Sequence, residues 1–272
     1  IKKLIKKCVS NNFIEFDTSP SYKKADKILL EFKRKNPTIL INTKCGWDLN
    51  MKRTYDIDEI KKGIEITLEK FGKINVLQLH NPRNEIKNWD LIIEMFNYYK
   101  KKRLINFSGI SLARNYYFSS KILNSFDFIQ DEFNLLRIDP IKKMKNYKNI
   151  LAARSVFANG ILTDGFKKKS IYQENDHRSS WLRGNRKKNI FTQKEILEKL
   201  NKDNIAQFAM NFVMHYEIFD KFIFGFRTEK QFNTFLENLK NLKPLEKNTI
   251  QKIISLHNNN KYFLKRKLRY NN

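Results

Sequence analysis

The stretch LEKFGKINVLQLHNP, residues 68–82, decides the fold, because it holds the end of a helix, a buried strand and a polar loop in direct succession. Upstream of the strand, apolar side chains recur at helical spacing, at Ile60, Ile64, Leu68 and Phe71. Gly72 follows at a helix C-cap position, where glycine is favoured. The apolar run 76–79 then has the length of a buried strand. A helix that leads into such a strand is typical of a parallel sheet covered by helices.

The same alternation of short apolar runs and helical stretches continues along the chain. The runs that fit buried strands are residues 13–16, 38–43, 76–79, 105–110, 126–130, 150–154 and 222–225. None of them is followed by the glycine-rich turn of a Rossmann fold. Seven strand–helix repeats in 272 residues therefore predict a single-domain (β/α)8 TIM barrel. A helix precedes the first of these runs, so we expect the first strand of the barrel to lie upstream of Ile1 or to be divergent.

Three further helices are predicted from spacing. Leu91, Met95 and Tyr98 form an apolar stripe, and Thr192 with Glu195 forms a capping box that opens another helix. Apolar positions across residues 205–216 predict the third. The core is expected to include Phe13, Phe107, Phe133 and Phe212.

The whole chain, residues 1–272, is predicted to be one domain that contains two irregular segments. Residues 155–190 form the longest gap between strands and helices, and loops of that length are usually functional or mobile. Residues 257–272 read as a basic, flexible tail.

Composition limits the possible classes of protein. The formal net charge is +26, from 54 Lys and Arg against 28 Asp and Glu, which indicates either a nucleic-acid binder or lysines spread over solvated helix faces. The dispersal of the lysines favours the second interpretation, so no nucleic-acid partner is expected. Cys8 and Cys45 form neither a disulfide framework nor a metal-ligand pattern, so no metal is predicted. No apolar run is long enough to cross a membrane, and a reducing, cytoplasmic location is expected.

Polar residues follow three of the predicted strands at their carboxyl ends. Asp17, Lys44 and His80 occupy these positions, and Tyr22 lies one helical turn after the first strand. Each residue alone has a structural explanation, such as a helix cap or a solvated side chain. Because the carboxyl ends of barrel strands meet at one rim, the four groups are expected to converge.

These residues stand in segments that resemble the aldo-keto reductase family. FDTSPSY, INTKCG, LEKFGKINVLQLHNP and NFSGISL are similar to successive motifs of that family. FIQDEFNLL, ARSVFANGILTDGF and IFGFRTEKQF continue the resemblance, in order, over nearly the whole chain. The resemblance implies a barrel enzyme that uses NADP, with NAD as the alternative, to interconvert an alcohol and a carbonyl compound such as an aldehyde, ketone or sugar.

The residue types suit that chemistry. Reduction of a carbonyl group needs a hydride at carbon and a proton at oxygen. Tyr22 is assigned as the general acid/base, and a nearby ammonium is expected to lower its pKa from about 10. Lys44 would supply this charge, Asp17 would hold Lys44, and His80 would orient the carbonyl oxygen.

The cofactor residues follow from the resemblance alone. Ser111 and Gln130 would hold the nicotinamide carboxamide, and Arg154 would pack near the ring or form an ion pair at its strand end. The phosphate-binding turn would comprise Gly225, Arg227, Thr228 and Gln231, with Thr228 and Gln231 also fitting a capping box. Arg227 would favour NADP over NAD. Trp47 is either a wall of the substrate pocket or a packing residue.

Four positions depart from the family's pattern. Leu112 stands where an asparagine is common, and Phe235 replaces an asparagine expected to recognise adenine. Lys23 and Asp26 replace a glycine and a glutamate. Leu112 and the missing first strand keep a second possibility open, a cofactor-binding regulatory protein on the same fold with slow or no turnover. Substrate, reaction direction and oligomeric state are not predicted.

Overall fold

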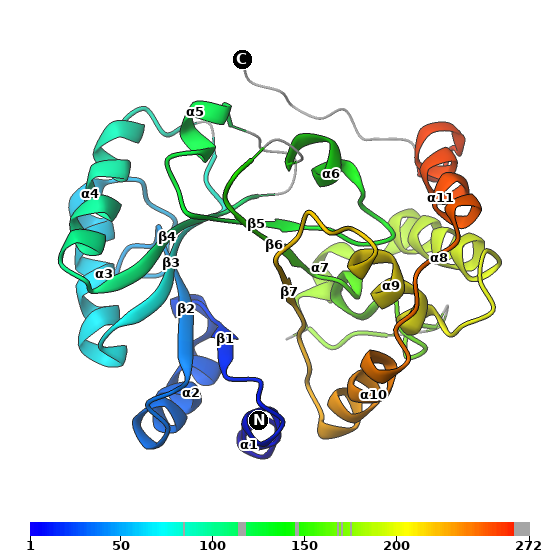
Figure 1. Cartoon of the computed structure of the whole chain (residues 1–272), viewed down its shortest axis with the longest axis horizontal. Coiled ribbons are helices and arrows are strands. Elements are labelled where there is room, and N and C mark those ends of the chain that lie inside the picture. Colours follow the sequence, from blue (N-terminus) through cyan, green and yellow to red (C-terminus); the bar gives the residue numbers. More distant parts are fainter. Residues whose placement is uncertain are drawn as a thin grey trace.

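The computed structural model describes residues 1–83, 85–113, 118–144, 147–167, 169, 171–174 and 176–263. Its seven strands form one sheet in chain order, all parallel. They are β1 (Glu15–Asp17), β2 (Leu40–Cys45), β3 (Ile74–His80), β4 (Ile105–Ser111), β5 (Phe128–Glu132), β6 (Ile150–Arg154) and β7 (Lys221–Ile223). The sheet curves into a nearly closed barrel of the (β/α)8 type, with helices on its outer side (Figure 1). All seven predicted strands are present, with ends shifted by up to two residues.

The helices alternate with the strands, as the sequence predicts. They are α1 (Lys2–Ser10), α2 (Lys23–Lys35), α3 (Ile57–Phe71), α4 (Trp89–Lys101), α5 (Ser120–Leu123), α6 (Asp139–Met144), α7 (Arg178–Trp181), α8 (Gly184–Glu198), α9 (Ile205–Met214), α10 (Glu229–Lys240) and α11 (Lys247–Asn259), with two short 3₁₀ helices, η1 (Pro20–Tyr22) and η2 (Ala158–Gly160). Gly72 is the C-cap of α3, as expected. Within the ranges that the structure describes, no helix combines the length and the apolar character needed to cross a membrane.

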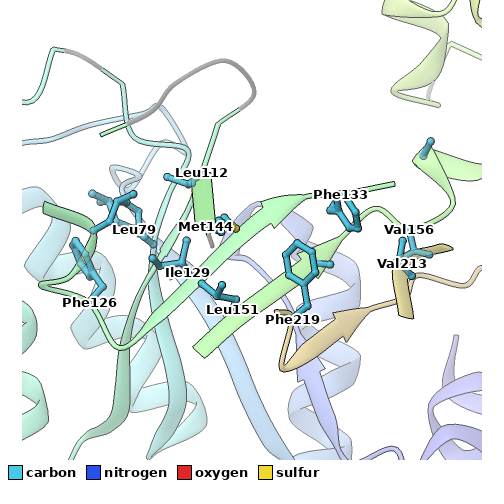
Figure 2. Close-up of a cluster of buried hydrophobic side chains, with 14 of the residues drawn as sticks. Leu79, Leu112, Phe126, Ile129, Phe133, Met144, Leu151, Val156, Val213 and Phe219 are labelled. Atoms are coloured by element: carbon cyan, nitrogen blue, oxygen red, sulfur yellow. The ribbon is translucent and has the colours of Figure 1, made fainter. Parts of the chain in front are cut away.

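The outer strand faces and the helices enclose the main core. Figure 2 shows part of it, where Ile129 and Leu151 lie side by side on β5 and β6. Phe133 stacks on Phe219 with ring centroids 4.8 Å apart. Because side chains alternate along a strand, a buried Ile129 on the outer face directs its neighbour Gln130 into the barrel. The apolar core thus fixes which side chains reach the interior.

A seam lies between the first and last strands, β1 and β7, which are not joined by a backbone ladder in the described part of the chain. Two interactions close it. The ammonium of Lys221 on β7 pairs with the carboxylate of Glu15 on β1. Helix α1 packs against α10, and phenylalanines such as Phe13, Phe232 and Phe235 pack edge to face between them. Phe235 is therefore part of this seam, 3% exposed.

Several local predictions were wrong. The buried face of α4 carries Ile92, Met95, Phe96 and Tyr99, whereas Leu91 and Tyr98 are exposed. Met95 is buried as predicted, but the other two predicted positions are each one residue away from the buried Ile92 and Tyr99. Phe107 is 37% exposed and so is not a core residue.

Two further boundaries differ from the predictions. Thr192 does not cap a helix; it lies inside α8, and its hydroxyl donates to the carbonyl of Lys188 one turn earlier. Residues 257–263 are not a free tail, because His257 and Phe263 are buried and the His257 Nε2 is 2.9 Å from the Leu135 carbonyl oxygen. Residues 264–272 lie outside the described ranges.

Gly109 on β4 makes room for a polar side chain inside the barrel. A methyl group at Gly109 would lie 2.8 Å from Cγ of Gln78 and 3.2 Å from the Phe128 carbonyl oxygen. The Gln78 side chain crosses this space to reach Asp17, with a 3.0 Å hydrogen bond from its Nε2. The absence of a side chain at residue 109 is thus needed for the interior network.

We therefore expect Gly109→Ala to lower the free energy of unfolding by about 1–3 kcal/mol, through overpacking of a filled interior. Urea unfolding measures this change. Gly165→Ala is the matched control, because the nearest atom to its added methyl group is 3.6 Å away. Equal stability of the two variants would contradict the proposed role of Gly109.

Candidate active site

One cleft, with a volume of about 560 Å³, opens at the carboxyl ends of the strands. The sequence-predicted residues that line it are Asp17, Tyr22, Lys44, His80, Ser111, Gln130, Arg154, Gly225, Arg227 and Gln231. Trp47 and Thr228 are not among its lining residues. The structure thus brings together groups that lie up to 214 positions apart in the chain (17 to 231). Across the described ranges, no group of three or more His, Cys, Asp and Glu side chains is arranged to hold a metal ion.

The carboxylate of Asp17 is the centre of the cleft's polar network. The ammonium of Lys44 pairs with its Oδ1, and that ammonium also donates to the Thr18 carbonyl at 2.8 Å. The amide groups of Gln78 and Gln130 donate to its Oδ2 at 3.0 and 2.9 Å. The side chains of Lys44 and Asp17 are only 3% and 12% exposed. Removing one member of such a buried ion pair leaves an uncompensated charge, so each depends strongly on the other.

Tyr22 is the last residue of η1, in the loop after β1, and its side chain lines the cleft. Burial of the hydroxyl and then the Asp17 carboxylate raise the pKa of Tyr22, while the Arg154 guanidinium acts in the opposite direction. We expect a modest shift because the residue as a whole is 51% exposed. The direction is opposite to the sequence-based prediction, in which Lys44 lowers this pKa. The main reason is that burial disfavours the charged phenolate; in addition, the Lys44 charge is already paired with Asp17.

His80 ends β3 and has a defined proton arrangement. The indole Nε1 of Trp47 donates to its Nδ1 at 3.1 Å, so in the neutral ring Nε2 carries the proton. Burial lowers the pKa of His80 to about 3, and the positive charges of Lys44, Arg53 and Arg154 contribute further. The ring is therefore a neutral hydrogen-bond donor at physiological pH.

Ser111 and Gln130 lie side by side on β4 and β5 and bond to each other. The hydroxyl of Ser111 donates to Oε1 of Gln130 at 3.2 Å. The Nε2 of Gln130 donates to Asp17 and, at 3.0 Å, to Oε1 of Gln78. The donors of Gln130 are thus committed to the Asp17 network. The two oxygens, on Ser111 and Gln130, keep lone pairs for a ligand.

Arg154 extends from β6 across the barrel mouth. Its Nη2 donates to the backbone carbonyl of Leu112 at 2.9 Å, and its charge acts on both Tyr22 and His80. The Leu112 side chain is buried and carries no polar atom. Its position therefore contributes only backbone groups to this rim.

The far end of the cleft is a strand-to-helix turn. Thr228 is the N-cap of α10, and Gln231 completes the predicted capping box. Arg227 does not stand free: its Nη1 donates to Asp176 at 2.8 Å, and Asp176 is also bonded by Arg178 at 2.6 Å. The two arginines hold the pKa of Asp176 well below its ordinary value. Asp176 thus links the segment after β6 to the turn before α10.

The segment after β6 lines the cleft with backbone in the left-handed region. Two of its N–H groups are bonded within the segment, from Ala158 to the Ser155 carbonyl at 2.7 Å and from Gly160 to the Phe157 carbonyl at 2.8 Å. Ser155, Ala158, Asn159 and Gly160 have φ values of 58°, 46°, 59° and 87°. Left-handed residues in succession turn adjacent N–H groups toward one side and form a concavity that binds anions. Ser155, Asn159 and Gly160 all line the cleft.

Three residues that contact the candidate site, Gln78, Arg53 and Asp176, were not predicted from the sequence. Gln78 could have been found, because a glutamine inside an apolar strand two residues before His80 must share its face. Arg53 and Asp176 lie in irregular segments, where no periodicity indicates what their side chains contact. The donor role of Trp47 toward His80 was likewise missed, because its indole contacts a residue 33 positions away.

Comparison with known protein families shows which family the chain belongs to. The sequence model of the aldo/keto reductase family matches residues 1–258. The chain belongs to this family. Membership makes it an oxidoreductase of the aldo/keto reductase kind, and members of this family use nicotinamide cofactors.

Solved structures agree on the fold. The glycerol dehydrogenase AKR11B4 from Gluconobacter oxydans superposes with a TM-score of 0.75 at 17% identity, over 100% of this chain and 88% of that one. The holo form of the aldo-keto reductase AKR11C1 from Bacillus halodurans gives a TM-score of 0.75 at 16% identity, over 94% and 86%. No protein of curated function matches the chain.

The low pKa of His80 predicts how stability depends on pH. The unfolded chain binds a proton on this ring below a pH of about 6.5, whereas the folded chain binds it only near about 3. The unfolded state therefore gains protons as the pH falls between these values, and the free energy of unfolding decreases. We expect His80→Gln to lose less stability than the unaltered chain between about pH 7 and about pH 5. Urea unfolding at both pH values tests this, and equal losses would contradict it.

Proposed function

We propose that the chain reduces a small carbonyl compound with NADPH, with Tyr22 as the proton donor. One observation carries the proposal. Tyr22, His80 and the buried Lys44–Asp17 pair line a single cleft that extends to the cationic turn at Arg227. The family supplies the oxidoreductase class, and the residues of the cleft suggest the finer assignment.

The residues of the cleft fit a nicotinamide dinucleotide. At one end, the oxygens of Ser111 and Gln130 can accept from a carboxamide. In the middle, the left-handed backbone at Ser155 and at residues 158–160 would lie beside the pyrophosphate, in a conformation that is common in anion-binding turns. At the other end, the N-terminus of α10 and Arg227 suit a further phosphate. When bound, the dinucleotide would supply the hydride.

The protein's own groups would handle the proton and the carbonyl oxygen. The neutral His80 ring would donate its Nε2 proton as a hydrogen bond to that oxygen and orient it. Tyr22 would transfer its phenolic proton to the same oxygen as the hydride reaches carbon, and then regain a proton from solvent. Asp17 would hold the Lys44 ammonium in place, and the Arg154 guanidinium would be the positive charge that stabilises the phenolate as it forms.

The protonated state of the Tyr22 phenol suits the reductive direction, which consumes a proton. Near neutral pH its phenol is almost entirely protonated and can donate. Alcohol oxidation would need the phenolate, which forms only at high pH. Carbonyl compounds are therefore the first substrates to test. The structural similarity to a glycerol dehydrogenase makes small polyols and their aldehydes a reasonable part of the panel.

Tyr22→Phe removes the proposed proton donor and keeps the ring. We expect the reductase kcat to fall by about 10²–10⁴-fold with aldehydes, ketones or sugars, because general acid catalysis is lost. NADPH binding, followed by nicotinamide fluorescence, should be preserved. Tyr98→Phe is the control, since Tyr98 is exposed on α4. Full turnover in Tyr22→Phe would refute the assignment.

Arg227 should distinguish NADPH from NADH. Arg227→Met is expected to raise the Kd of NADPH by about tenfold or more, because a charge-assisted hydrogen bond to the additional phosphate is lost. The Kd of NADH should change by less than about twofold, which makes NADH the internal control. An equal effect on both cofactors would show that Arg227 does not recognise that phosphate.

A cofactor-binding regulatory protein with slow turnover is the second candidate. The apolar side chain of Leu112 favours it, because this position offers no hydrogen bond to hold the carboxamide. Tight NADPH binding without turnover of any substrate in the panel would support this candidate over the first.

A further inference from the structure

His80 is held by two residues that do not line the cleft. One is Trp47, whose indole N–H donates to Nδ1 of His80. The two rings meet edge to face, with centroids 5.4 Å apart. This contact fixes both the tautomer and the rotation of the imidazole, but it depends on where the indole itself is placed.

Arg53 determines that placement. Its guanidinium lies over the Trp47 ring, with Cζ 4.7 Å from the centroid. The backbones of Trp47 and Arg53 also form an antiparallel bridge, and the Asp48 N–H donates to the Lys52 carbonyl at 2.8 Å within the same turn. The turn therefore holds the indole of Trp47 and the guanidinium of Arg53 against each other.

The same guanidinium also fixes the backbone of His80. Its Nη1 donates to the His80 carbonyl and, at 2.9 Å, to the Asn81 carbonyl. Asn81 has a positive φ of 49°, a conformation that asparagine adopts more readily than other non-glycine residues. Arg53 thus contacts the histidine from two directions, through its main chain and through the indole bonded to its ring.

We infer that Arg53 is a positioning residue, which sets the orientation and tautomer of His80 by stacking on Trp47 and binding the carbonyls of residues 80 and 81. This inference rests on the proposed function for its kinetic part only. Packing alone would not need an arginine here, because an apolar side chain could cover the indole. Only a cationic donor can both stack on the indole and bind two carbonyls.

Three variants separate the parts of this arrangement. Arg53→Met removes the charge and the donors, Arg53→Lys keeps a cation that can reach the carbonyls, and Trp47→Phe removes only the indole donor. Arg34→Met, on the exposed face of α2, is the control. The full-length protein, labelled with ¹⁵N in histidine, is examined by long-range ¹H–¹⁵N NMR, with His80 assigned from His80→Gln. Reductase kinetics are measured on the same samples.

We expect the His80 spectrum to show an unprotonated Nδ1 and a protonated Nε2 in the unaltered chain, in Arg34→Met and largely in Arg53→Lys. Arg53→Met and Trp47→Phe should show a mixture of tautomers. In these two variants kcat should fall by about fivefold or more with KM changed less than about twofold, because the donor to the transition state is misplaced. A single unchanged tautomer with full kcat in Arg53→Met would overturn the inference. Since the NMR result needs no turnover, an inactive unaltered chain would count against the proposed function alone.

Discussion

The buried ion pair between Asp17 and Lys44 is the interaction on which the site depends. Taking two charges out of water is costly, and the cost is offset only when the remaining lone pairs and protons are bonded. The barrel meets this requirement with amides from β3 and β5 and with the Thr18 carbonyl. Four strands, β1, β2, β3 and β5, and one loop must therefore come into register before the charges are satisfied. The candidate catalytic groups are held in fixed positions, because the buried ion pair would lose its hydrogen bonds if these strands moved apart.

Much of this arrangement could be predicted from local sequence. The strands were found because apolar runs of strand length alternate with helical spacing, and the convergence of Asp17, Lys44 and His80 followed from the geometry of parallel strands. Placing Tyr22 in the cleft needed only its position one turn beyond β1. These features depend on periodicity and chain order, which a single sequence contains.

Other features depend on contacts between distant irregular segments. The Lys44 side chain was expected to lower the pKa of Tyr22, but burial of the phenol and the Asp17 carboxylate raise it, and the Lys44 ammonium is bonded to Asp17 and Thr18. The direction of this pKa shift was therefore predicted incorrectly. The contacts of Arg53 and Asp176 have no periodic signal, because a loop side chain can turn toward any neighbour within reach. Helix phase was also uncertain: shifting the α4 stripe by one residue exchanges exposed Tyr98 for buried Tyr99.

The seam between β1 and β7 gives the cleft a dependence on ionic strength. The Glu15 and Lys221 side chains that join these strands are 28% and 37% exposed, so dissolved ions screen their attraction far more than they screen the enclosed charges above. Glu15 lies only two positions before Asp17 on a strand of three residues. Concentrated salt would therefore weaken the attachment of β1 to β7 first. Strand β1 also carries Asp17, whose buried carboxylate needs the most hydrogen-bond partners.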